Sequence, residues 1–312
     1  MKKILGVNIS HHCSFAYFEN DVLKEYYEED RFNKIKHFEP PNPILEEYEY
    51  EVLKKFKNIV FDAVVFVSFV REHVLVDKAY IDNILKQVKT KDIKFYNNYH
   101  HIFHAMCGYY FGKFKKALVL VTDGGGDRIF KPCYSLQVME SIFLINNKKI
   151  KKFYQAASNI GLSYFNEFKN NVKEIKTTEN GVDLKLTNQP IGGHKYLRYT
   201  LEAGFKENQE GQLMGIAAYK DKKTNLDKNV LEIANKAQEE TLQDRIELIE
   251  KALSYSNCKN IILSGGYHLN CANNFKLVKH FPELNFFVDP IPYDGGTAIG
   301  VAYYHYEENF KN

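Results

Sequence analysis

One pattern of apolar runs and polar turns occurs twice in this chain, and it limits the folds that the chain can adopt. The first copy starts with an apolar run at residues 4–8 and ends, after a polar turn, in a hairpin pattern at residues 14–27. The second copy starts at residues 117–122 and ends, after three consecutive glycines, in a hairpin pattern at residues 135–156. Repetition after about one domain length is typical of a duplicated fold. The sequence therefore predicts two similar α/β lobes with a cleft between them.

Helices and further strands are expected to complete each lobe. In the first lobe, residues 62–69 form an apolar run typical of a buried strand, and residues 74–88 and 100–110 have helical patterns. In the second lobe, residues 226–255 place their apolar side chains near one stripe and predict a long amphipathic helix. Residues 173–199 lack clean periodicity and contain a proline and a Gly-Gly pair, so a long loop or insertion near the cleft is expected there.

Charge and cysteine content exclude several classes of protein. Lysine and arginine number 42 and aspartate and glutamate 39, and the net charge of +3 is too small to favour a nucleic-acid binder that relies on a basic face. The five cysteines include no Cys-x-x-Cys pair, which suits a reducing cytosol better than a disulfide framework. No apolar run approaches the roughly 18 residues that a membrane helix needs. We expect a cytoplasmic protein without a membrane partner.

Two histidines and two aspartates are candidate metal ligands. His100 and His104 are four residues apart on a predicted helix, so their imidazoles point the same way, as in helical metal sites. Histidines on a surface helix face explain this spacing equally well. Asp123 ends a predicted strand beside three glycines and Asp294 precedes a Gly-Gly turn, where each alone is more often a plain turn residue. Together in one cleft, the four side chains would suit Fe(II), Mn or Zn.

Glycines follow three predicted strands, where backbone amides could gather around phosphate oxygens. These glycines are Gly124, Gly125, Gly126, Gly265, Gly266, Gly295 and Gly296. No loop among them matches a P-loop or a dinucleotide fingerprint, and each alone is more often only a turn, but their joint presence favours a nucleotide. His11 and His37 are candidate general bases because imidazole titrates near neutral pH, although a hydrogen-bonded surface histidine is the plainer interpretation of either.

Six stretches between residue 5 and residue 304 carry a family resemblance. They are LGVNISHHCS, EEDRFNKIKH, HHIFHAMCGYYFGKFKKALVLVTDGGGD, EGQLMGIAAY, NIILSGGYHLNCANNFKL and PYDGGTAIGVAYY. In this order they resemble the N-terminal part of the O-carbamoyltransferases of the nodulation and antibiotic-tailoring type, which is similar to the universal threonylcarbamoyltransferase domain. The resemblance implies the superfamily of sugar kinases, heat-shock chaperone ATPases and actin (ASKHA), with duplicated ribonuclease H-like lobes. The first lobe would comprise residues 1–115, with the closing helix 296–312 packed on it, and the second residues 116–295.

The resemblance also assigns roles to individual residues. The family's metal ligands match His100, His104, Asp123 and Asp294, and the implied ion is Fe(II), with Mn or Zn as alternatives. The family's catalytic histidines match His11 and His37. The residues expected at an ATP-derived nucleotide are Gly124, Gly125, Gly126, Glu210, Gly211, Gly265, Gly266 and Asn270.

The implied activity is transfer of a carbamoyl group from carbamoyl adenylate to a hydroxyl of a small-molecule acceptor. This chain has His12 where the family usually has Asp, and Gln212 where Lys is usual. Family members normally continue into a YrdC-like domain that makes carbamoyl adenylate from carbamoyl phosphate and ATP, so a separate YrdC-like activating protein is an expected partner. Two alternatives stay open. One is threonylcarbamoyl transfer to tRNA adenosine, against which the small net charge argues, and the other is a non-catalytic nucleotide-binding subunit of a two-component carbamoyltransferase.

Overall fold

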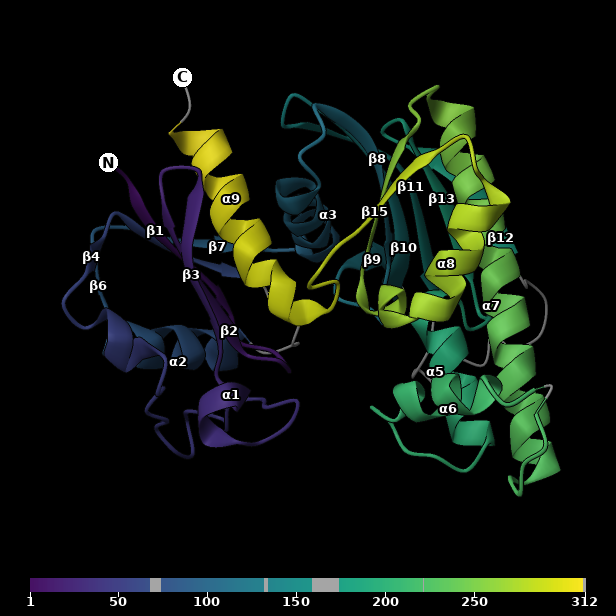
Figure 1. Cartoon of the computed structure of the whole chain (residues 1–312). Coiled ribbons are helices and arrows are strands. Elements are labelled where there is room, and N and C mark those ends of the chain that lie inside the picture. The colour runs from purple at the N-terminus through teal and green to yellow at the C-terminus, as the bar shows by residue number, and fades with distance from the viewer. Residues whose placement is uncertain (68–73, 132–133, 159–173, 221, 311–312) are drawn as a thin grey trace. The chain divides into compact units, whose positions relative to one another are not determined.

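The chain divides into two compact units, each with its own sheet and helices (Figure 1). Unit 1 comprises Met1–Lys113 and Asp289–Asn312, and unit 2 comprises Phe114–Val288. The computed structural model describes residues 1–67, 74–131, 134–158, 174–220 and 222–310. Within these ranges, no helix has both the length and the apolar character that crossing a membrane requires.

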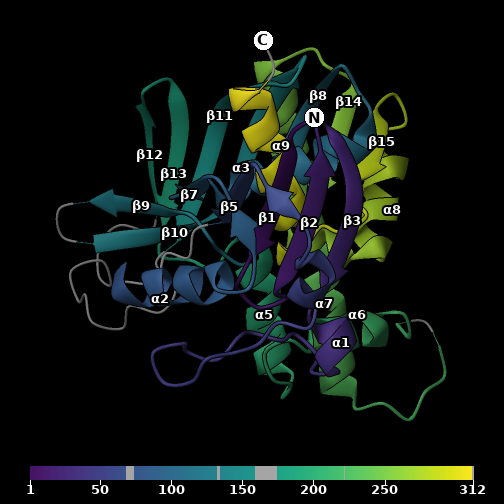
Figure 2. The same cartoon turned by 90° about the vertical axis from the view of Figure 1, so that its left-hand side faces the viewer.

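Unit 1 is built on a five-stranded sheet with the order β3-β2-β1-β5-β7. Its strands are β1 (Lys3–Asn8), β2 (Ser14–Glu19), β3 (Val22–Glu28), β5 (Ala63–Val67) and β7 (Ile93–Tyr96). Strands β1, β2 and β3 form the antiparallel meander predicted from the first copy of the pattern, and β5 and β7 continue the sheet in parallel (Figure 2). The predicted strand at residues 62–69 is confirmed over β5, and residues 68 and 69 lie outside the described ranges.

The two faces of this sheet are covered by different elements. Alternate residues of β1 and β2, such as Leu5 and Phe15, pack into an apolar core with Tyr50 and Phe56. This core also receives side chains from α2 (Val74–Leu85). Helix α9 (Thr297–Asn309) packs on β1, β2 and β5, and helix α3 (His100–Gly112) packs on α9.

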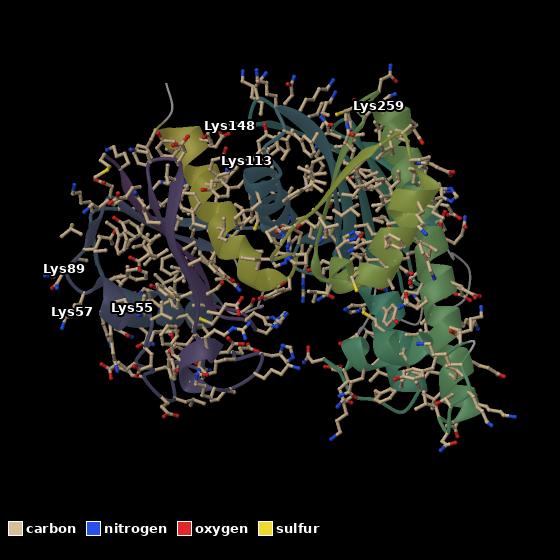
Figure 3. All side chains as sticks on the ribbon, viewed as in Figure 1. Lys55, Lys57, Lys89, Lys113, Lys148 and Lys259 are labelled. Atoms are coloured by element: carbon tan, nitrogen blue, oxygen red, sulfur yellow. The ribbon has the colours of Figure 1, made fainter. Side chains whose placement is uncertain are left out.

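Unit 1 also contains several shorter elements. The four-residue helix α1 (Asp30–Asn33) follows β3, and a 3₁₀ turn, η1 (Leu53–Phe56), contributes to the apolar core. Strands β4 (Val60–Phe61) and β6 (Lys89–Thr90) form a separate parallel pair. Figure 3 shows Lys57 and Lys89 beside this pair with their ammonium ends directed outward, so the basic groups there are solvated.

Helices α3 and α9 approach each other closely at Gly300. A Cβ atom at Gly300 would lie 1.9 Å from the backbone oxygen of Phe103, a distance that no side chain tolerates. The contact therefore fixes α3, and with it any side chain on α3, against the start of α9. We expect Gly300→Ala to lower the free energy of unfolding by about 1–3 kcal/mol, as measured by urea denaturation, because the helices must separate.

Gly215 provides the matched control for this substitution. It lies within a helix of unit 2, and an added Cβ would meet no atom within 4 Å. Gly215→Ala should raise stability by about 0.5–1 kcal/mol, because alanine restricts the unfolded chain more than glycine does. Equal losses of stability at both positions would contradict the role assigned to Gly300.

Unit 2 repeats the plan of unit 1 and extends it. Its sheet has the order β12-β13-β11-β10-β8-β14-β15, with β9 paired to β10. The strands are β8 (Lys116–Thr122), β9 (Arg128–Lys131), β10 (Tyr134–Asn146), β11 (Lys149–Ser158), β12 (Glu174–Glu179), β13 (Val182–Thr187), β14 (Asn260–Ser264) and β15 (Asn285–Val288). The run β11-β10-β8-β14-β15 has the same order and strand directions as β3-β2-β1-β5-β7 of unit 1. The predicted duplication is thereby confirmed.

Among the described residues of unit 2, four α-helices pack on one another or on the sheet. They are α5 (Gly192–Glu202), α6 (Glu210–Ala217), α7 (Lys228–Tyr255) and α8 (Cys271–His280). The C-terminal half of α7 buries Leu248 and Ile249 against the sheet residues Ile142 and Ile261, while α5 and α6 pack on its N-terminal half. The long amphipathic helix predicted at residues 226–255 is confirmed.

The loop expected at residues 173–199 is not a loop. Within the described part of this segment, strands β12 and β13 form a hairpin, and β13 extends the sheet in parallel with β11. Helix α5 follows. The expectation of a loop was wrong because β12 lies at the edge of the sheet and carries mostly exposed lysine, threonine and glutamate, so the hydrophobic alternation that marks a half-buried strand is missing. The alternative of an insertion agrees with the structure, since β12 and β13 extend the five-strand order that the two units share.

Candidate functional site

Three candidate metal ligands meet in unit 1. Because His100 and His104 are one helical turn apart on α3, their Nε2 atoms lie 3.0 Å from each other. Asp294 opens the 3₁₀ turn η3 (Asp294–Gly296) before α9, and its Oδ1 atom lies 3.4 Å from Nε2 of His100 and 3.5 Å from Nε2 of His104. All three side chains are buried. The packing of α3 on α9 thus brings together residues that are far apart in the sequence.

Three hydrogen bonds hold Asp294 in place. Its backbone oxygen accepts from Nδ2 of Asn8 at 3.1 Å and from the Thr297 hydroxyl at 2.6 Å. Its Oδ2 atom accepts from the Ser10 hydroxyl at 3.1 Å. Burial alone would raise the pKa of Asp294, but the neighbouring histidines, His11 first among them, hold this pKa well below its usual value. The carboxylate is therefore ionised, as metal binding requires.

The three ligand atoms fit a divalent first-row ion. Neighbouring ligand atoms around an ion with bonds of about 2.1 Å are about 3.0–3.4 Å apart, close to the separations among His100, His104 and Asp294. Two imidazole nitrogens and carboxylate oxygens are ligands that Fe(II), Mn and Zn accept.

His11 lies beside the same carboxylate. Its Nε2 atom is 3.4 Å from Oδ2 of Asp294, and its side chain is 52% exposed, so an incoming molecule can reach the ring. The Nδ1 atom of His37 lies 2.6 Å from Nε2 of His12, the residue that stands where the resembled family usually has Asp. Two causes lower the pKa of His12 to about 4. Burial is the larger cause, and the charge of the neighbouring His11 is the second.

The fourth candidate ligand, Asp123, belongs to unit 2. It follows β8, and its Oδ1 atom accepts a hydrogen bond of 2.9 Å from the backbone N–H of Gly266. Gly265 makes this contact possible. Its φ is +92°, and a Cβ there would lie 2.3 Å from the backbone oxygen of Thr122. This hydrogen bond therefore links the loops after β8 and β14. That Asp123 binds the same ion as the ligands of unit 1 stays a prediction.

The other residues expected at a nucleotide have identifiable structural positions. Asn270 caps helix α8 by accepting from the backbone N–H of Asn273 at 3.2 Å, and its amide donates to Gln238 at 2.8 Å. Glu210 and Gly211 form the first turn of α6, where Glu210 accepts from the backbone N–H of Asn208. The roles of these residues in binding stay predictions.

His194 is a candidate that the sequence analysis missed. It lies in the first turn of α5, where Gly193 donates its N–H to the backbone oxygen of Asp123 at 3.0 Å, and its ring packs next to Gly124. Burial lowers the pKa of His194, and its Nδ1 atom is buried without a hydrogen-bond partner among the described residues. The Gly192-Gly193 pair at the start of a helix was the available signal, because the Gly265-Gly266 and Gly295-Gly296 pairs also stand at helical turns.

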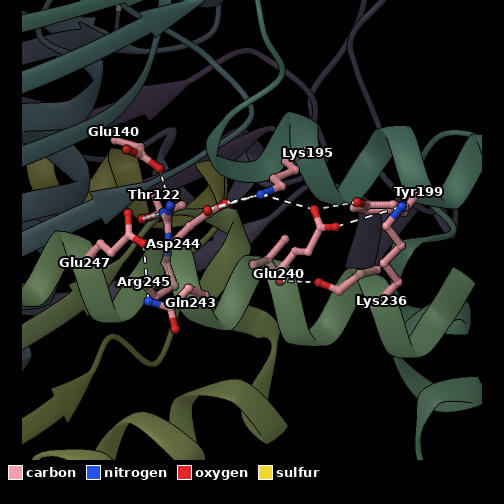
Figure 4. Close-up of polar contacts among 12 residues, drawn as sticks. Thr122, Glu140, Lys195, Tyr199, Lys236, Glu240, Gln243, Asp244, Arg245 and Glu247 are labelled. Atoms are coloured by element: carbon pink, nitrogen blue, oxygen red, sulfur yellow. Dashed lines mark hydrogen bonds and ion pairs between the residues drawn. The ribbon is translucent and has the colours of Figure 1, made fainter.

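A buried ion pair contacts the end of β8, next to the loop that carries Asp123 (Figure 4). Arg245 on α7 pairs with Glu140 on β10 and donates to the hydroxyl of Thr122 at 2.7 Å. Arg245 is 3% exposed and Glu140 is 7% exposed. Burial opposes the charge on Arg245, but Glu140 raises its pKa above the usual value. Because Thr122 precedes Asp123, this pair anchors the strand end that presents the candidate ligand.

The two units define an α/β protein with a duplicated fold. A ROK family protein from Streptococcus pneumoniae in complex with sucrose has a similar structure, with a TM-score of 0.54 and 11% identity over 99% of both chains. Full-length HypF in its phosphate- and nucleotide-bound form is similar at a TM-score of 0.57 and 12% identity, over 98% of this chain and 55% of that chain. At such identities the likeness shows the fold alone.

The family follows from the sequence match. The family model for the carbamoyltransferase N-terminus matches residues 44–248 and 224–303, so this chain belongs to that family. An uncharacterised protein of Synechocystis sp. is 24% identical over 100% of this chain and 58% of its own length. The chain spans less than two thirds of the length of the curated relatives that it matches.

Proposed function

We propose that this chain performs the transfer step of an O-carbamoyltransferase, moving a carbamoyl group from carbamoyl adenylate to an acceptor hydroxyl. The observation that carries the proposal is the convergence of His100, His104 and Asp294 beside an exposed His11, in a member of the carbamoyltransferase N-terminus family. This arrangement offers a place for a cation and a base within reach of one another. The proposed transfer uses the cation at the phosphate of the departing nucleotide and the base at the acceptor hydroxyl.

The metal ligands of the proposal are His100, His104 and Asp294, with Asp123 of unit 2 as the fourth. The ion is Fe(II), or else Mn or Zn, which accept the same donor set. When bound, such an ion neutralises the negative charge on the phosphate of the departing nucleotide. The protein's part is to hold the ligands before the ion arrives, and the hydrogen bonds from Asn8, Ser10 and Thr297 to Asp294 do this.

In the transfer step, the acceptor oxygen forms a bond to the carbamoyl carbon. His11 takes the proton of the acceptor hydroxyl, the bond between the carbamoyl carbon and the phosphate oxygen breaks, and AMP departs with its electron pair. The products are the carbamate ester of the acceptor and AMP. The exposed position of His11 supports its role, because the base must reach a hydroxyl that arrives from solvent.

The nucleotide is proposed to bind at the loops of unit 2. Gly124, Gly125 and Gly126 follow β8, and Gly265 and Gly266 follow β14, so both loops stand at strand ends where phosphate oxygens are proposed to bind. The N–H of Gly266 already donates to Asp123 and is not counted among the phosphate donors. The HypF structure named above contains phosphate and a nucleotide, which supports this part of the proposal. Glu210, Gly211 and Asn270 are proposed to complete the nucleotide site. Gln212 is neutral where the family usually has a lysine, which removes one positive charge from it.

The proposal names two partners. One is a small molecule with a free hydroxyl, which accepts the carbamoyl group. The other is a YrdC-like protein, or a YrdC-like part of a longer chain, that makes carbamoyl adenylate from carbamoyl phosphate and ATP. Both partners are needed for a complete assay.

The experiment that tests the proposal compares wild type with His11→Ala. Each protein is loaded with Fe(II) and incubated with ATP, carbamoyl phosphate, a YrdC-like activating protein and a panel of sugar and polyketide hydroxyl compounds, and carbamate esters are detected by mass spectrometry. His11→Ala should lower the transfer rate by roughly 10²- to 10⁴-fold, because a general base contributes that much. AMP binding, measured by calorimetry, should not change.

His280→Ala is the matched control, because His280 is an exposed histidine at the end of α8. It should transfer the carbamoyl group at the wild-type rate. If wild type carbamoylates no compound of the panel and fails to bind AMP, the proposed function is wrong. If His11→Ala transfers at the wild-type rate, the base is misassigned.

A further inference from the structure

The space over Gly124 is bordered by the imidazole ring of His194. Gly124 is exposed, and a Cβ atom built on it would lie 3.6 Å from Cδ2 and 3.9 Å from Nε2 of His194. These two atoms form one edge of the ring, so this edge faces the position that a side chain at residue 124 would occupy. Because glycine has no side chain, that position is open to a ligand atom beside Nε2.

Gly193 fixes His194 beside this loop. A Cβ atom at Gly193 would lie 3.0 Å from the backbone oxygen of Asp123 and 3.0 Å from the backbone nitrogen of Gly124. The N–H of Gly193 also donates to the backbone oxygen of Asp123 at 3.0 Å. Helix α5 therefore begins in direct contact with the loop after β8, and the position of His194 in its first turn follows from that contact.

The nitrogen at this edge of the ring carries a proton. The other nitrogen of His194, Nδ1, is buried, and no residue in the described ranges offers it a hydrogen bond. A buried N–H without an acceptor is rarer than a buried lone pair without a donor, so the tautomer with its only proton on Nδ1 is disfavoured. In the other two forms, a neutral ring with its proton on Nε2 and a doubly protonated ring, Nε2 is a hydrogen-bond donor.

Two cationic side chains of unit 2 near this loop are bound to carboxylates (Figure 4). Nζ of Lys195 lies 3.1 Å and 2.9 Å from the two carboxylate oxygens of Asp244. Arg245 pairs with Glu140. His194 differs from both, since its Nε2 edge faces the open position over the glycine loop.

We propose that Nε2 of His194 donates a hydrogen bond to the phosphate group of the bound nucleotide, in the space over Gly124. The inference rests on the proposed function, which places phosphate oxygens at the loop after β8. Gly124 gives the phosphate room, and the imidazole N–H supplies a donor to its charged oxygens. In this role His194 is a binding residue and takes no proton from the acceptor hydroxyl, which is the task of His11.

A comparison of AMP with adenosine separates binding of the phosphate from binding of the nucleoside. Both Kd values are measured by calorimetry on Fe(II)-loaded wild type, His194→Ala and His194→Gln, and wild type should bind AMP more tightly than adenosine. In His194→Ala the Kd for AMP should rise roughly 10- to 100-fold, because a hydrogen bond to a charged group is lost. The Kd for adenosine should not change. His194→Gln, whose amide donates, should keep more of the preference for AMP.

Lys195→Ala is the matched control. It removes a full positive charge from the next residue, but this charge is bound to Asp244, so the preference for AMP should equal that of wild type. If Lys195→Ala loses as much of the preference as His194→Ala does, the effect is one of general charge and the inference is wrong.

Three other results overturn the inference and leave the proposed transfer intact. They are an unchanged preference for AMP in His194→Ala, equal losses of AMP and adenosine binding, which would mean that His194 only supports the loop, and a lower iron content in His194→Ala, which would mean that it acts through the metal. If wild type binds neither compound, or binds both equally, the nucleotide part of the proposed function fails together with the inference.

Discussion

Replacing His104 with alanine should abolish metal binding and carbamoyl transfer together. The His104 side chain is fully buried on α3, and its Nε2 atom lies within 3.5 Å of both His100 Nε2 and Asp294 Oδ1. Loss of a residue that merely orients a ligand weakens metal binding by roughly 10- to 100-fold, and loss of a ligand itself should exceed that. The measurement is the Fe(II) content after anaerobic loading and dialysis, with Zn(II) affinity measured by competition.

Two companion variants make this result interpretable. His280→Ala should keep the wild-type metal content, because His280 is exposed on α8. Asp123→Asn retains the oxygen that accepts from Gly266, so unit 2 should stay folded while one proposed ligand is weakened. A metal content near one ion per chain in His104→Ala would contradict the proposed site. If Asp123→Asn keeps a full metal content while His104→Ala loses it, Asp123 is not a ligand. The ion would then be held by the ligands of unit 1.

Replacing Arg245 with alanine should lower the free energy of unfolding by about 3–5 kcal/mol. The substitution leaves the carboxylate of Glu140 buried without its cation, and an uncompensated buried charge costs about that much. It also removes the hydrogen bond to Thr122, which precedes Asp123. Urea denaturation followed by circular dichroism measures the loss.

The double variant Arg245→Met with Glu140→Leu separates charge from packing. Replacing both partners removes the buried charges and keeps most of the volume, so this variant should lose much less stability than Arg245→Ala. If the double variant loses as much as Arg245→Ala, the effect comes from packing around α7 and the electrostatic interpretation is wrong. If Arg245→Ala loses less than about 1 kcal/mol, Glu140 is not left as a costly buried charge and the electrostatic interpretation is wrong.

The parts of the site that could be predicted depend on neighbours along the chain. His100 and His104 were expected on one helix face because the helical repeat alone places residues four apart together, and their Nε2 atoms lie 3.0 Å from each other. The glycine loops after β8 and β14 were expected because an apolar run followed by glycines marks a strand end. The β12–β13 hairpin was missed, since an exposed edge strand carries little hydrophobic pattern.

The sequence by itself determined the duplicated α/β plan, the long helix α7 and the two histidines on α3, because each of these depends on the spacing of residues within one segment. The tertiary structure alone decided that Asp294 meets these histidines, that His37 pairs with His12 and that Arg245 pairs with Glu140. These contacts join residues far apart along the chain. Their distances are set by how helices pack on sheets, at positions such as Gly300, and no local spacing encodes that packing.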